Sequence, residues 1–87
     1  MISNSYLVKR LHEIIVEQIL KEPGRVLLPK EKIISTGLID SFNLINLALI
    51  IEETLGVQIK NSELNFNSFD TISELAKLIE KRKNHHN

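Results

Sequence analysis

Large apolar side chains recur at intervals of three and four residues in three segments of this chain, and this spacing restricts the fold more than any other feature. It matches the 3.6-residue turn of an α-helix, so each segment is predicted to be a helix with one buried stripe. The middle helix is expected over about 41–55, with Asp40 as its N-cap and Gly56 at its end. Its buried stripe consists of Leu44, Leu47, Ala48, Ile51 and Leu55.

The other two helices have equally clear boundary signals. The first is expected to start from a cap within residues 3–5 and to run to about Lys21, because Pro23 and Gly24 follow it. The last is expected to open with a capping box formed by Thr71 and Glu74, and residues 84–87 are expected to be a frayed tail. Their apolar stripes are Leu7, Leu11, Ile14, Ile15 and Ile19 in the first helix, and Ile72, Leu75, Ala76 and Ile79 in the last.

The connections between these helices also contain apolar residues. The long loop over residues 25–39 is expected to pack onto the bundle through Val26, Leu27, Leu28, Ile33 and Ile34. After the middle helix we expect an extended link that buries Val57 and Ile59, a short helical piece at residues 63–65, and two buried aromatic side chains, Phe66 and Phe69. The predicted fold is all-α: a single domain over residues 1–87, built as a small four-helix bundle of three long helices and one short one with a long first loop.

Composition excludes several classes of function. With 11 basic and 11 acidic residues the net charge is zero, which argues against a nucleic-acid partner. The richest apolar run, residues 42–51, is about half the length needed to cross a bilayer, so no membrane association is expected. Residues 1–5 lack the pattern of a secretion signal, and a cytoplasmic location is expected. There is no cysteine, so any thiol chemistry must come from an added group.

The sequence Gly-Leu-Ile-Asp-Ser-Phe at residues 37–42 is the candidate functional site. It places the hydroxyl of Ser41 at the positive end of a helix, beside the carboxylate of Asp40, where a phosphate-linked group is favoured. The alternative is a helix-start serine next to an ordinary cap. A catalytic serine is not indicated, because the chain has no G-x-S-x-G sequence. A metal site is not indicated either, because His12 has no ligand partner four residues on.

The side of the middle helix opposite its buried stripe is unusually apolar. It holds Phe42, Ile45, Asn46, Leu49 and Glu53, with Glu52 at its edge. Three large apolar side chains on an outward face indicate partner binding, although the long loop could instead cover them. The two glutamates either contact a partner or form an ordinary solvated surface.

Nearly the whole chain resembles the acyl and peptidyl carrier protein family. Three of that family's signals occur here in order, and together they are fairly specific. They are the Asp-Ser-Phe that opens the middle helix, the Glu-Glu-Thr-Leu-Gly at residues 52–56 before an extended link, and the Phe-Asp-Thr-Ile at residues 69–72 before the last helix.

The resemblance implies a non-catalytic carrier. The motif serine of that family, here Ser41, is esterified with 4′-phosphopantetheine, whose thiol carries an acyl or aminoacyl group as a thioester. The implied partners are a phosphopantetheinyl transferase, in whose complex Asp40 would assist recognition and metal placement, a loading ligase or acyltransferase, and a downstream tailoring or condensing enzyme. A freestanding monomer is expected.

The chain departs from the family pattern at three points. Phe42 replaces the usual leucine after the serine, Asn43 and Asn46 stand where many fatty-acid carriers have acids, and the net charge is zero. Weak charge steering favours docking through Phe42, Ile45 and Leu49, and indicates a specialised pathway rather than housekeeping fatty-acid synthesis. The rival hypothesis is an unmodified helical adaptor that binds a partner through the same three side chains.

Overall fold

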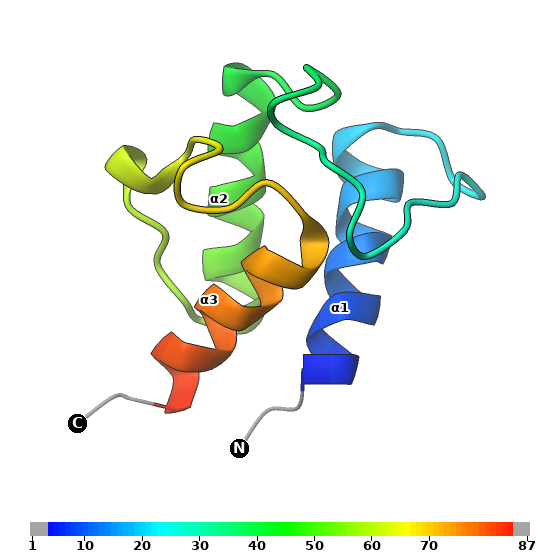
Figure 1. The fold of residues 1–87 in the computed structure, drawn as a ribbon. Helices are drawn as coiled ribbons and strands as arrows, with labels where there is room; N and C mark the ends of the chain where they lie inside the picture. Colours follow the sequence, from blue (N-terminus) through cyan, green and yellow to red (C-terminus); the bar gives the residue numbers. More distant parts are fainter. Residues whose placement is uncertain (1–3, 85–87) are drawn as a thin grey trace.

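Three α-helices form the frame of the protein, which the computed structural model describes over residues 4–84. They are α1 (Asn4–Glu13), α2 (Ser41–Leu55) and α3 (Ile72–Asn84) (Figure 1). α3 packs on α1, and α2 packs on the residues that directly continue α1. The predicted all-α class is confirmed, since residues 4–84 contain no strand.

The first helix changes its winding before it ends. α1 passes directly into η1, a π-helix over Ile14–Ile19, in which the Leu20 amide donates to the carbonyl of Ile15, five residues back, across 2.8 Å. Three consecutive side chains of η1, Ile14, Ile15 and Val16, are buried. Since consecutive residues of a helix point in clearly different directions, η1 must be covered from several sides.

The ends of the helices differ in how well the sequence predicts them. The first helix stops before Lys21, which has a left-handed φ of 55°, and therefore before Pro23. α1 begins at Asn4, while Ser3 lies outside the described residues. Asn84, expected in a tail, is the last residue of α3, and the rest of that tail also lies outside the described residues.

Both ends of α2 are as predicted. The side chain of Asp40 accepts a hydrogen bond from the Asn43 amide at 2.8 Å. The backbone carbonyl of Asp40 accepts a second hydrogen bond, from the Leu44 amide at 2.9 Å. At the other end Gly56 has a φ of 71°, a conformation that costs glycine little, and its amide donates to the carbonyl of Glu52 at 3.0 Å. Four residues of the predicted stripe are buried, and Ala48 is partly buried.

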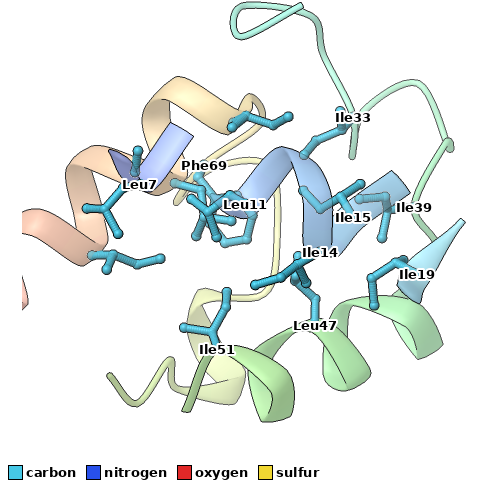
Figure 2. Packing of buried hydrophobic residues seen from close by; sticks show 14 of the residues in the cluster. Leu7, Leu11, Ile14, Ile15, Ile19, Ile33, Ile39, Leu47, Ile51 and Phe69 are labelled. Atoms are coloured by element: carbon cyan, nitrogen blue, oxygen red, sulfur yellow. The ribbon is translucent and has the colours of Figure 1, made fainter. Parts of the chain in front are cut away.

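The core gathers side chains from every α-helix and from the long loop. Figure 2 shows Ile14 of η1 pointing toward Leu47 of α2, with Ile33 and Ile39 of the loop on the side of Ile15. No polar side chain among the described residues is buried. The loop prediction is correct in part, because Leu27 and Ile33 are buried and Ile34 is half-buried, whereas Val26 and Leu28 are exposed.

The connection from α2 to α3 corrects two predictions. The short helical piece is a single 3₁₀ turn, η2 (Asn61–Glu63), two residues earlier than expected, so the described chain has three α-helices rather than four. Phe69 is buried as predicted, but Phe66 is 58% exposed. The side chain of Asn65 accepts hydrogen bonds from the amides of Asn67 and Ser68, and this local turn leaves Phe66 at the surface. The extended link before η2 buries Val57 and Ile59 as expected.

The start of α3 contains one of the two hydrogen bonds of the predicted capping box, and the other bond is made to the preceding residue instead. Thr71 Oγ1 accepts from the Glu74 amide at 3.0 Å, as predicted. Glu74 Oε1 accepts from the amide of Asp70 at 2.7 Å rather than from that of Thr71. Among residues 4–84, no helix combines the length and the apolar character that a membrane span requires.

Candidate attachment site at the start of α2

Ser41 is the first residue of α2, and its side chain is exposed. The chain reaches it through Asp40, whose backbone is extended (φ −82°, ψ 174°), and through Ile39, which is 1% exposed. Gly37 has a φ of 80°, which an L side chain rarely adopts, so glycine is required at this bend. The loop is therefore anchored in the core directly before it presents the serine to solvent.

The backbone around Ser41 is suited to a negatively charged group. The first two amides of α2, those of Ser41 and Phe42, have no hydrogen-bond partner in the described part of the chain. The next two amides of the helix, those of Asn43 and Leu44, already donate hydrogen bonds to Asp40. A phosphodiester on Ser41 Oγ would lie close to two unpaired N–H groups at the positive end of the helix dipole, so the residues present fit such a group.

An apolar surface continues from Ser41 along the outer side of α2. Phe42 is 81% exposed, Ile45 is 49% exposed and Leu49 is 55% exposed, and we call these three residues the apolar face. The long loop does not cover them, although the sequence left that alternative open. The other predicted partner-binding residues, Asn46, Glu52 and Glu53, are also exposed on α2, so the structure brings all six candidate residues to one side of a single helix.

The loop before the serine forms a shallow depression, and the one histidine among residues 4–84 already has a hydrogen-bond partner. A shallow, open depression of about 370 Å³ lies in the loop before α2, lined by Arg25, Glu31, Lys32, Thr36, Gly37 and Leu38. The ring of His12 is engaged elsewhere, because its Nε2 accepts a hydrogen bond from the Leu27 amide at 3.1 Å. Over residues 4–84, no group of three His, Cys, Asp or Glu side chains is arranged to hold a metal ion.

Asp70 connects the loop before Ser41 to the start of α3. Its Oδ1 accepts from the amides of Ile34 at 2.8 Å and Ser35 at 2.9 Å, and its Oδ2 accepts from the Ser35 hydroxyl at 2.5 Å. Its backbone carbonyl accepts from the Ile33 amide at 2.8 Å. This role of Asp70 was not predicted from the sequence. Its signals were its position before Thr71 and its place in the Phe-Asp-Thr-Ile sequence at residues 69–72, and neither signal identifies hydrogen-bond partners about 35 residues away.

The environment of Asp70 favours its charged form. Burial raises the pKa of this carboxyl, but the hydrogen bonds from Ser35 and Ile34 and the nearby charge of Lys32 outweigh burial, so the pKa lies below its ordinary value. An ionised Asp70 accepts all three hydrogen bonds at once.

Comparison with known protein families identifies the class of this chain. A family model described as "phosphopantetheine attachment site" matches residues 9–79, which is most of the sequence. Comparisons with curated proteins and with solved structures gave no match. Members of the matched family carry covalently attached 4′-phosphopantetheine on a serine, are modified by phosphopantetheinyl transferases and interact with other enzymes. The chain belongs to this family of phosphopantetheine-binding carrier domains.

Proposed function

We propose that Ser41 is the attachment serine and that this chain works as a carrier without catalysing a reaction. The observation that carries the proposal is the exposed hydroxyl at the first position of α2, next to two unpaired amides, within a chain that belongs to the phosphopantetheine family. Of the described serines, only Ser41 stands at the first position of an α-helix.

The modification is a phosphoryl transfer from coenzyme A. Ser41 Oγ loses its proton and forms a bond to phosphorus, while the bond from that phosphorus to the adenosine bisphosphate half of coenzyme A breaks. The new arm ends in a thiol, which the protein itself lacks because it has no cysteine. That thiol would hold an acyl or aminoacyl intermediate as a thioester, at a high local concentration for enzymes docked on α2.

The apolar face is proposed as the surface that partner enzymes contact. It begins at Phe42, directly after Ser41, and the chain has no net charge with which to steer a basic partner. The proposed partners are a phosphopantetheinyl transferase, a loading ligase or acyltransferase, and a downstream tailoring or condensing enzyme. The low charge distinguishes this chain from strongly acidic fatty-acid carriers and supports a role in a specialised biosynthetic pathway.

The rival function is an unmodified adaptor that uses the apolar face alone. Incubation with coenzyme A and a broad-specificity transferase, followed by intact-mass measurement, separates the two functions. We expect wild type to gain one phosphopantetheine group, and Ser41→Ala to gain none. Ser62→Ala is the matched control, because Ser62 is also exposed, and this variant should be modified like wild type. An unmodified wild type would favour the adaptor.

Docking is tested separately with Leu49→Glu. Leu49 is 55% exposed, so the substitution places a negative charge on the apolar face. It leaves Ser41 unchanged. We expect the KM of the transferase for the carrier to rise about tenfold, the effect of losing roughly 1.4 kcal/mol of binding energy. Val26→Glu, at a loop residue that is 75% exposed, makes the same charge change elsewhere and should leave KM unchanged. Strong salt sensitivity combined with indifference to Leu49→Glu would show that docking is electrostatic instead.

A further inference from the structure

The segment over residues 33–39 is closed on itself. The Ile39 amide donates to the carbonyl of Ile33 at 2.9 Å, and the Gly37 amide donates to the carbonyl of Ile34 at 2.9 Å. Ile33 and Ile39, at the two ends of the segment, are at most 1% exposed. The segment therefore forms one hydrogen-bonded unit with both ends in the core, and it ends directly before Asp40 and Ser41.

This unit is fastened to the rest of the protein through Asp70. The three hydrogen bonds of the Asp70 carboxylate and the one at its carbonyl all reach residues 33–35, where the unit begins. Asp70 is itself held in place by two features. Its amide donates a hydrogen bond to the side chain of Glu74, and the preceding residue, Phe69, is buried at 2% exposure. A side chain at the start of α3 thus fixes the backbone that leads into α2.

We infer that Asp70 is a positioning residue for the modification of Ser41, an inference that rests on the proposed function. It holds residues 33–39 so that the surface beside Ser41 and the approach to the Asp40 cap are already formed when the transferase arrives. The part of α2 from Leu44 onward is held separately, by the burial of Leu44 and Leu47, whereas Ser41 lies at the exposed end of the helix, two residues after Ile39.

Because Asp70 holds residues 33–39 while buried side chains hold α2, the inference predicts which kinetic constant changes when Asp70 is replaced. The apolar face is exposed on α2, and the buried side chains Leu44 and Leu47 keep α2 on the core when Asp70 is altered, so binding of the carrier to the transferase should be preserved. The alignment of the Ser41 hydroxyl in the complex should be lost for part of the time. The expected effect is therefore a lower kcat at nearly unchanged KM.

The experiment measures phosphopantetheinylation rates of the full-length apo chain against carrier concentration, with coenzyme A and a broad-specificity transferase. For Asp70→Ala we expect kcat to fall about tenfold and KM to change by less than about twofold. Asp70→Asn keeps an oxygen that can accept from the two amides, and it should recover most of the rate. Glu31→Gln is the control. Glu31 lies in the same loop, and its Oε1 accepts a hydrogen bond from the Leu28 amide, which is outside residues 33–39.

Circular dichroism of each variant verifies that the helices are intact. A folded Asp70→Ala with wild-type kcat and KM overturns the inference, and so does a variant in which only KM rises. Equal losses in Asp70→Ala and Asp70→Asn also contradict it, since the amide oxygen would then provide no rescue. If Asp70→Ala does not fold, Ser35→Ala decides: kcat about twofold lower supports the positioning role, and an unchanged kcat overturns it. An unmodified wild type would refute the proposed function itself, and the positioning role with it.

Discussion

The ion pair between Glu63 and Arg82 offers a sharp test of how the connection from α2 to α3 is held. The Arg82 guanidinium bonds to both carboxylate oxygens of Glu63, and it also donates to the carbonyl of Gln58 at 2.9 Å. The pair joins η2 to α3 across 19 residues of sequence. The hydrogen bonds from Arg82 lower the pKa of Glu63 to about 2, against the opposing effect of burial, with further help from the Lys60 amide.

The size of the effect follows from that pKa. A lowering from 4.5 to about 2 corresponds to about 3 kcal/mol at roughly 1.4 kcal/mol per pH unit. The Arg82 and Glu63 side chains are 32% and 20% exposed, so solvent screening reduces the expected contribution to about 1–2 kcal/mol. Because the folded-state pKa is the lower one, this stability is complete above about pH 5 and is lost as pH falls toward about 2.

Urea unfolding of wild type and Glu63→Gln at several pH values measures this contribution. At pH 7 we expect Glu63→Gln to be less stable by about 1–2 kcal/mol, and we expect that difference to shrink by more than half between pH 5 and about pH 3. Glu53→Gln, which removes an exposed acid on α2, should stay close to wild type at each pH. A difference that is the same at pH 7 and at pH 3 would refute the assigned role of the charge.

Two further substitutions test single hydrogen bonds at the helix ends. Asp40→Ala removes the cap on the Asn43 amide and should lower the free energy of unfolding by about 1 kcal/mol, whereas Asp40→Asn should cost only a few tenths; equal values in urea titrations would contradict the capping role. His12→Ala leaves the amide of Leu27, a buried residue, without its acceptor and should also cost about 1 kcal/mol. An unchanged midpoint for His12→Ala would mean that water replaces the imidazole without loss.

The sequence alone predicts α2 well because its signals are local. The cap at Asp40 acts on an amide three residues away, the stop at Gly56 depends on its own φ, and the buried stripe follows from regular spacing. The same local signals place Ser41 at the exposed start of α2. These features need no knowledge of what packs elsewhere, so single-sequence reasoning was sufficient for them.

The features that were missed depend on partners that are distant in sequence or on competing local turns. Asp70 bonds to residues 35 and 36 positions away, and His12 bonds to an amide 15 positions away. Phe66 was predicted to be buried, but the local turn at Asn65 leaves it exposed. The π-helical winding of Ile14–Ile19 likewise has no signature in apolar spacing alone.

The most direct test of the central claim is to locate the modification on the chain isolated from its own cells. Tryptic cleavage after Lys32 and Lys60 gives a peptide of residues 33–60, whose only serines are Ser35 and Ser41. Tandem mass spectrometry of this peptide should place phosphopantetheine on Ser41. A chain that carries no such group, or one that carries it on Ser35 or outside this peptide, would contradict the account.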